Sequence, residues 1–357
     1  MLPVASAVGI IILATGSIWL GAVLGSKKPE PKDEITDETL DLTWWQVMLM
    51  PVTSSLFLLL LFYYFSYIQV VMILFIVTGS GLSCVDVIRS SVSAFAPSFN
   101  GNISTILSVL FTIYMIIQWA TNGSIIAHDV LGCSICISSI ALIRFPSLKL
   151  AAVCLTLLLL YDIFWVFYSE YFFNKNVMVE VATKSAINPL HALGVTYQIN
   201  ILKSLQPKLQ LPIKLLMPSS FLPGSRLMML GLGDIALPGF LISLALRCDI
   251  YHANKILLPQ YDTQNNLNSN LSLDYRTKVL TTNTDTNTYK TSSNLFMYGL
   301  IGYVLGLILA FYIGSISGHA QPALIYLVPG VMIPIAFRAW QTSTFLEVWN
   351  GPSKISD

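Results

Sequence analysis

The chain has 357 residues, of which 55% are hydrophobic and only 10% are charged. Soluble domains carry about 25% charged residues, so this composition cannot cover a water-facing surface and predicts a membrane protein with the lipid bilayer as its partner. The formal net charge of +1 argues against nucleic acid as a partner.

Nine apolar segments have roughly the 20-residue length that a helix needs to cross a bilayer. They lie at residues 3–25, 45–64, 67–88, 103–121, 124–143, 147–169, 226–247, 295–315 and 322–341. Only a short aromatic stretch separates the second segment from the third. The first segment lacks a basic n-region and is longer than a signal-peptide core, so we expect it to be a span. The sequence therefore predicts an all-α membrane protein with nine transmembrane helices.

Positive charge predicts the orientation of these helices. With a lumenal N-terminus, Lys and Arg lie at the cytosolic ends of the segments, and the short lumenal loops near residues 65, 122 and 318 hold none. The loop 170–225 does carry lysines, but long loops are translocated largely regardless of charge. We therefore expect a lumenal N-terminus and a cytosolic C-terminus.

The expected spans divide the chain into six parts. These are a six-helix part (1–169), a lumenal loop (170–225), a single helix (226–247), a cytosolic loop (248–294), the last two helices (295–341) and a cytosolic tail (342–357). Residues 259–294 are rich in Asn, Thr and Ser, so we expect the cytosolic loop to be largely disordered.

Two sets of apolar residues alternate within the lumenal loop. They are Val177, Val179 and Val181, and then Leu209, Leu211, Ile213 and Leu215. Period-2 patterns of this kind predict strands and therefore a possible small lumenal β-hairpin. An exposed strand edge could hold an unwound substrate by β-augmentation. A hairpin without substrate contact is an equal alternative.

Three carboxylates lie well inside the expected spans, at Asp129, Asp162 and Asp234. Inserting an ionisable side chain at this depth of the bilayer costs about 2.5–3.5 kcal/mol, so each of these carboxylates is a candidate functional residue. Asp162 lies eight residues before Glu170, and Asp234 lies eight residues after Arg226. Because their two helices are antiparallel and a helix rises 1.5 Å per residue, both carboxylates lie about 12 Å from the lumenal boundary. The spacing therefore predicts that Asp162 and Asp234 lie at the same depth in the membrane.

Two carboxylates that meet in a low-dielectric site share one proton. The ionised member can then activate water while the protonated member polarises a peptide carbonyl, as in aspartic proteases. Gly231 and Gly233 would let a substrate or helix approach Asp234 closely. Depth and spacing also fit a multi-pass transporter or proton-coupled carrier with a paired-carboxylate site at mid-membrane. A structural role is a third possibility.

Three short motifs resemble the signatures of the GxGD intramembrane aspartyl proteases. They are Tyr161-Asp162, Gly231-Leu232-Gly233-Asp234 and Gln321-Pro322-Ala323-Leu324. Within that family, signal peptide peptidase and its relatives are similar over YDIFWVF, NVMVEVA, PIKLLMP and MLGLGDIALPG. The signal-peptide-peptidase-like 3 branch resembles this chain most closely, over IRFPSLK and Asn188-Pro189-Leu190.

The resemblance implies an intramembrane aspartic endopeptidase with Asp162 and Asp234 as the catalytic residues. The motif residues implied to shape its active site are Tyr161, Gly231, Leu232, Gly233, Gln321, Pro322, Ala323 and Leu324. It implies no metal or other cofactor. The implied substrates are type II membrane proteins, processed by Golgi glycosyltransferase shedding or as signal-peptide stubs. The implied location is the Golgi membrane, with the endoplasmic reticulum as the alternative, and the oligomeric state stays open.

Two further pairs have chemistry of their own. Cys133 and Cys136 form a C-x-x-C, which can indicate a metal or redox site. No second pair or His cluster completes a zinc set, so we expect small buried residues there. For His128 and Asp129 we expect a partly solvated pair near the membrane interface. A role in substrate access or in wetting the cavity is the alternative.

Overall fold

The computed structural model describes residues 4–27, 40–95, 101–175, 177–184, 186–200, 205–218, 227–265, 294–317 and 321–351. Within these ranges, seven helical stretches are long and apolar enough to cross a membrane. They are α1 (Val4–Lys27), α2 (Trp44–Phe95), α3 (Gly101–Asn122), α4 (Ile125–Leu142), α5 (Leu148–Ile163) with its continuations, α12 (Leu295–Ser317) and α13 (Leu324–Gln341). The π-helix η1 (Phe164–Tyr168) and the helix α6 (Ser169–Phe173) continue α5.

Helix α2 joins two of the expected spans. Its 52 residues would extend about 78 Å, more than twice the thickness of a hydrocarbon core. The helix is broken at Tyr64, whose φ of −115° and ψ of 18° are not helical. The break falls in the aromatic stretch between the expected segments 45–64 and 67–88, so α2 has the length for two crossings.

The sequence predicts one helix over 226–247, and this prediction is wrong at both ends. Residues Leu227–Gly231 form strand β6, and α10 runs from Gly233 to Asn265. Strand β6 pairs antiparallel with β5 (Lys214–Pro218), with Lys214 opposite Gly231. Glycines disfavour a helix, and hydropathy does not distinguish a buried strand from a helix. The part of the low-complexity segment at 266–293 lies outside the described residues.

Residues 170–225 are only partly strand. The strand expected at Val177, Val179 and Val181 is wrong, because Val177–Thr183 form helix α7. The backbone N–H of Val177 donates to the Ser169 hydroxyl at 3.3 Å, and such contacts override an intrinsic strand preference. Leu209 and Leu215 do lie in strands, in β4 and β5. The remaining elements are β3 (Ala186–Ile187), which pairs with β4 (Lys208–Leu209), and α8 (Pro189–Thr196).

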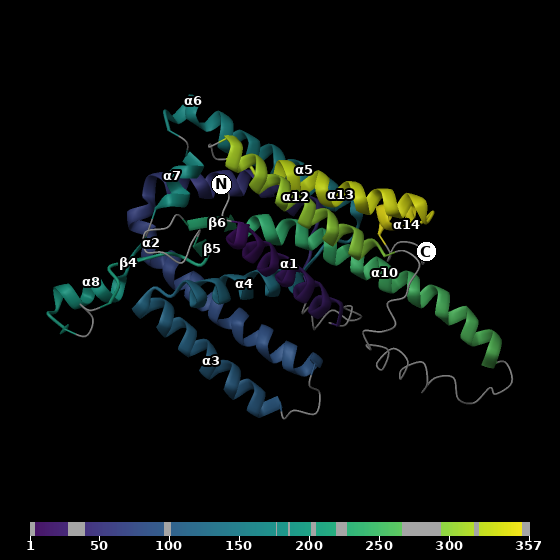
Figure 1. Cartoon of the computed structure of the whole chain (residues 1–357), viewed down its shortest axis with the longest axis horizontal. Coiled ribbons are helices and arrows are strands. Elements are labelled where there is room, and N and C mark those ends of the chain that lie inside the picture. Colours follow the sequence, from purple (N-terminus) through teal and green to yellow (C-terminus); the bar gives the residue numbers. More distant parts are fainter. Residues whose placement is uncertain are drawn as a thin grey trace.

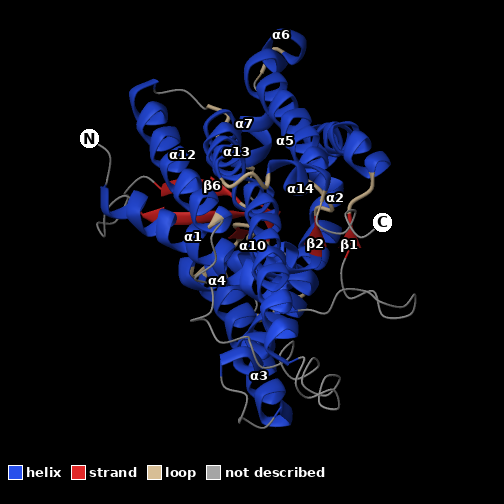
Figure 2. Cartoon of the chain, turned by 90° about the vertical axis from the view of Figure 1, so that its right-hand side faces the viewer, coloured by secondary structure: helices blue, strands red, loops and turns tan. Residues whose placement is uncertain are grey.

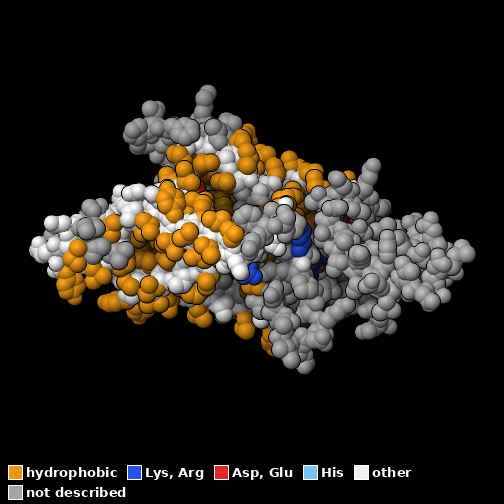
Figure 3. Space-filling view, turned by 90° about the horizontal axis from the view of Figure 1, so that it is seen from below, with side chains coloured by type: hydrophobic (Ala, Val, Ile, Leu, Met, Phe, Trp, Pro, Cys, Tyr) orange, Lys and Arg blue, Asp and Glu red, His pale blue; other side chains and the backbone are white. Residues whose placement is uncertain are grey.

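The helices form layers around α10. In Figure 1, α5, α12 and α13 run along the upper side, α1 and α10 through the middle, and α3 along the lower side. Helix α10 packs against α1, α4, α5, α12 and α13. Figure 2 shows β6 next to α1 and α10. Hydrophobic side chains cover much of the described surface in Figure 3, as expected for a protein that faces lipid.

The last described helix also packs against the other helices. Within the expected tail 342–357, residues Phe345–Asn350 form α14. The His252 ring of α10 lies 2.8 Å from the Glu347 carboxylate of α14. The remaining sheet pairs β1 (Leu40–Asp41) with β2 (Ile143–Arg144) in parallel.

Helices α12 and α13 approach each other closely through glycines. Gly302 and Gly306 are four residues apart on α12, and both face the backbone of α13. A Cβ added at Gly306 would lie 2.9 Å from the Tyr326 carbonyl oxygen. Small residues at this spacing let two membrane helices pack backbone to backbone. The position of the first turn of α13 therefore depends on α12.

We expect Gly306→Ala to lower the thermal stability of the detergent-solubilised protein. The methyl group must push α12 and α13 apart, and overpacking of this kind costs about 1–3 kcal/mol. The matched control is Gly314→Ala on the same helix, where an added Cβ would meet no atom within 4 Å. Equal melting temperatures for the two variants would contradict this account of the helix contact.

Candidate active site

Asp162 lies in the last turn of α5 and is 4% exposed. The π-helix η1 begins two residues later, and such wide turns within helices often mark functional sites. The ring of the neighbouring Tyr161 lies 6.4 Å from that of Trp165. The Trp165 indole in turn donates to the Ser55 hydroxyl of α2 at 3.0 Å. The contact of Trp165 with α2 thus helps to fix the end of α5.

The first turn of α13 faces Asp162. The backbone N–H of Leu324, the first residue of α13, donates to the Asp162 carboxylate. The carbonyls of Pro322 and Ala323 accept from the next N–H groups of the helix, at 3.3 and 3.0 Å. The Gln321 side chain accepts from the Tyr326 hydroxyl at 2.6 Å. The four residues of this motif therefore shape a helix N-terminus, and helix N-termini favour a negative charge.

Asp234 lies in the first turn of α10, directly after β6. The backbone N–H of Gly231 donates to its carboxylate. A Cβ added at Gly231 would lie 3.2 Å from Asp234 Oδ2, which is tighter than an ordinary contact. Leu232 forms the bend between strand and helix, and Gly233 is exposed with open space around its Cα. The missing side chain at Gly231 is thus what lets the carboxylate fold back over the strand end.

The structure brings Asp162 and Asp234 close enough for their charges to interact. Each carboxylate lies at the N-terminus of a helix and accepts a hydrogen bond from a backbone N–H. The N–H donors and the helix dipoles stabilise the negative charge of the carboxylates, which would otherwise be unfavourable in apolar surroundings. A pair of this kind can hold one proton between two oxygens and can transfer protons to and from a bound water.

Two residues that the sequence reasoning did not assign to this site lie beside it. Tyr303 of α12 is fully buried and interacts electrostatically with Asp234. Its hydroxyl has no hydrogen-bond partner among the described residues. The Cys136 thiol of α4 donates to the Leu232 carbonyl at 3.6 Å. The available signal for Tyr303 was a Tyr that directly follows a glycine in the middle of the glycine-rich helix α12.

The C-x-x-C and His-Asp pairs also have definite places. Cys136 is buried as expected, and Cys133 is half-buried. The expectation of a partly solvated His128–Asp129 pair is wrong, because the two residues are 2% and 8% exposed. Their partners lie on the segment that leads into β5 and on β5 itself.

Comparison with known proteins identifies the family. A family model described as signal peptide peptidase matches residues 34–354. The chain is 35% identical over 245 residues to signal peptide peptidase-like 1 of Arabidopsis thaliana, which is 67% of this chain and 59% of that protein. It is 32% identical over 343 residues to signal peptide peptidase-like 1 of Oryza sativa subsp. japonica, covering 90% and 85%. Signal peptide peptidase-like 3 of Arabidopsis thaliana is 29% identical over 344 residues, covering 91% and 53%.

The fold and these matches define a multi-pass membrane protein of the intramembrane aspartyl protease class. The chain belongs to the signal peptide peptidase family. The expected family is thus confirmed. The relatives include a signal peptide peptidase-like 3, and the two signal peptide peptidase-like 1 proteins have higher identity.

We expect Gly231→Ala to lower kcat for a transmembrane peptide about tenfold or more, because the methyl group displaces the Asp234 carboxylate. Gly233→Ala should act differently. Its Cβ meets no atom within 4 Å, so the methyl group faces an arriving peptide and should mainly raise KM. Steady-state kinetics on both purified variants makes the comparison, and an equal fall in kcat for the two would contradict the crowding at Gly231.

Proposed function

We propose that this protein is a GxGD-type intramembrane aspartic endopeptidase with Asp162 and Asp234 as its catalytic pair. Its substrates are type II membrane proteins, cut in or near their transmembrane segment. The observation that carries this proposal is that the buried Asp162 and the half-buried Asp234, on separate helices, lie close enough for their charges to interact, each accepting from a backbone N–H beside a helix N-terminus. Membership of the signal peptide peptidase family supports it.

The proposed chemistry uses one shared proton. The ionised carboxylate removes a proton from water as the water oxygen attacks the peptide carbonyl carbon. The protonated carboxyl gives its proton to the carbonyl oxygen, so a neutral tetrahedral intermediate forms. The intermediate collapses when the amide nitrogen takes the proton held by the pair, one hydroxyl of the intermediate gives its proton to the other carboxylate, and the carbon–nitrogen bond breaks. The pair is then left with one proton, ready for another cycle.

Strand β6 offers a means of presenting the peptide. A helical substrate must unwind before its peptide bond can be attacked, and its freed backbone groups then need partners. Strand β6 leads directly to Asp234 and pairs with β5 on one edge. No strand covers its other edge within the described ranges. We propose that an extended substrate segment adds to this edge by β-augmentation.

The proposed topology has nine spans. Seven helical stretches have spanning length and composition, α2 counts as two because of its break at Tyr64, and α10 supplies the ninth. The N-terminus is lumenal and the C-terminus cytosolic, according to the charge distribution. This orientation suits type II substrates that are released by shedding in the Golgi, with the endoplasmic reticulum as the alternative compartment.

We expect Asp162→Asn and Asp234→Asn each to lower cleavage of a transmembrane peptide by about 10³-fold or more, because neither amide can share the proton. The measurement is mass spectrometry of the products from purified enzyme, with and without a chelator, which should have no effect. The matched control is Asp86→Asn, which changes a carboxylate on a different helix, α2. This variant should keep normal activity.

The same experiment separates the protease from the transporter alternative. Near-normal cleavage by either Asp162→Asn or Asp234→Asn would show that the pair is not catalytic. Solute flux that depends on the two carboxylates, without peptide products from the wild type, would favour a proton-coupled carrier.

A further inference from the structure

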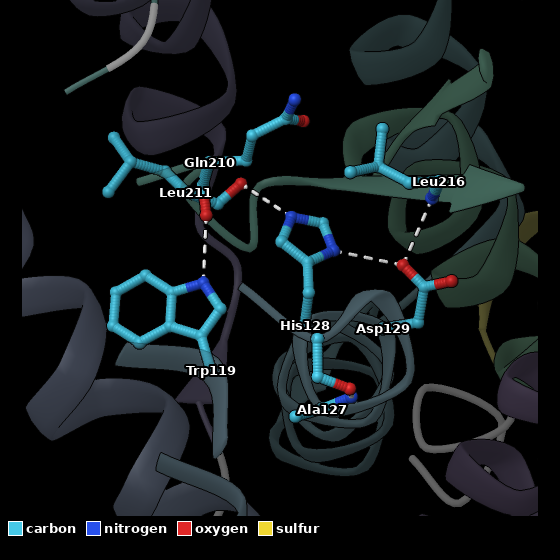
Figure 4. A network of polar contacts seen from close by, with 8 residues as sticks. Trp119, Ala127, His128, Asp129, Gln210, Leu211 and Leu216 are labelled. Atoms are coloured by element: carbon cyan, nitrogen blue, oxygen red, sulfur yellow. Dashed lines mark hydrogen bonds and ion pairs between the residues drawn. The ribbon is translucent and has the colours of Figure 1, made fainter. Parts of the chain in front are cut away.

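His128 and Asp129 form a buried network with backbone groups of a distant segment (Figure 4). The two ring nitrogens of His128 face different acceptors, with Nδ1 lying 2.9 Å from Asp129 Oδ1 and Nε2 lying 2.9 Å from the Leu211 carbonyl oxygen. The backbone N–H of Leu216 also donates to Asp129 Oδ1, at 3.0 Å. One helix turn of α4 thus holds both ends of the segment 211–216.

The hydrogen-bond pattern fixes the number of protons on the pair. The Leu211 carbonyl can only accept, so Nε2 must carry a hydrogen. Nδ1 and Oδ1 can bond at 2.9 Å only if a second proton lies between them. An ion pair and a neutral pair satisfy this count equally. An Asn at position 129 can still accept from the Leu216 N–H, but a bond from Nδ1 to its oxygen would need a charged imidazolium with no carboxylate to balance it.

The segment 211–216 pairs with strand β6, which leads to Asp234. Between its two anchored ends, the Ile213 carbonyl accepts from the Leu232 N–H at 3.1 Å. The next residue, Lys214, pairs with Gly231. Gly231 in turn donates its N–H to the Asp234 carboxylate. Hydrogen bonds and strand pairing therefore connect α4 through β5 to the backbone beside Asp234.

The same face of α4 supports the next part of that connection. A Cβ added at Gly132 would lie 3.5 Å from both the Pro212 carbonyl oxygen and the Leu232 side chain. One turn further along, the Cys136 thiol donates to the Leu232 carbonyl. Helix α4 therefore contacts both the segment 211–216 and the bend before α10.

We propose that His128 and Asp129 are positioning residues that act on Asp234 through strand β5. By fixing Leu211 and Leu216, they hold the backbone on which Gly231 and Leu232 rest. Asp129 also accepts the Leu216 N–H of β5, so this group of β5 is satisfied by α4. This inference rests on the proposed function of Asp234. A buried His–Asp pair adds little to the free energy of unfolding. Fixing the register of a backbone segment is a better-attested role for such a pair.

The test compares three variants of the full chain. Asp129→Leu keeps the branch at Cγ but removes both contacts to Oδ1, whereas Asp129→Asn keeps the Leu216 contact and loses the charge that balances the ring. The matched control is Trp119→Phe, which removes the indole hydrogen bond to the Gln210 carbonyl at 2.8 Å. That bond lies in the same network, but it holds the chain outside the segment 211–216 (Figure 4).

Two readouts are needed, amide hydrogen exchange of residues 227–236 and kcat per active enzyme. We expect Asp129→Leu to speed exchange in 227–236 and to lower kcat about 10- to 100-fold with little change in KM, because a displaced catalytic group costs this much. Asp129→Asn should fall between Asp129→Leu and the wild type. Trp119→Phe should keep slow exchange in 227–236 and a kcat within about twofold of the wild type, on the scale of a substitution that leaves the catalytic geometry intact.

The two readouts separate this inference from the proposed function. Unchanged exchange in 227–236 for Asp129→Leu overturns the inference, and so does an unchanged kcat in an enzyme whose wild type cleaves. If exchange is faster in Asp129→Leu but the wild type does not cleave, the positioning of Asp234 is supported and only the proposed proteolysis is contradicted. If Asp129→Leu does not fold, the graded loss in Asp129→Asn against Trp119→Phe decides on the same criteria.

Discussion

Asp162 is buried and Asp234 is half-buried inside a membrane protein, where water and counter-ions are scarce. The rest of this structure depends on how these two carboxylates are stabilised. Asp162 faces the first N–H of α13, and Asp234 lies in the first turn of α10 with the Gly231 N–H on its carboxylate. Helix N-termini and backbone donors are rigid and carry no counter-charge that could neutralise the pair. They therefore stabilise a negative charge while leaving a proton free to move between the oxygens.

Two separate supports bring these helix N-termini together. The close glycine contact between α12 and α13 sets the position of the Leu324 N–H. On the other side, α4 holds β5, β5 pairs with β6, and β6 ends at Gly231. The supports involve different helices, so a change in one should leave the other intact. This arrangement explains why glycines and a His–Asp pair remote from the reacting atoms matter to the geometry of the pair.

The depth estimated for Asp234 assumed a helix from Arg226, but residues 227–231 form β6. The sequence alone predicts the helical class, most of the spans and the family, because hydropathy and short motifs are local properties. It does not predict β6, since an apolar run of five residues such as 227–231 is compatible with strand and helix alike. It also misplaces His128 and Asp129 as partly solvated. Their partners are backbone groups of Leu211 and Leu216, more than 80 residues away, and no local pattern reveals such contacts.

The most direct measurement of the central claim is a binding titration with a labelled, non-cleavable hydroxyl isostere of the tetrahedral intermediate. Its hydroxyl should replace the attacking water and bond to both Asp162 and Asp234, so the isostere should bind more tightly than the matching substrate peptide. Asp234→Asn keeps the volume but not the shared proton, and affinity should fall by at least ~2 kcal/mol. Equal affinity for the wild type and Asp234→Asn would contradict a catalytic pair.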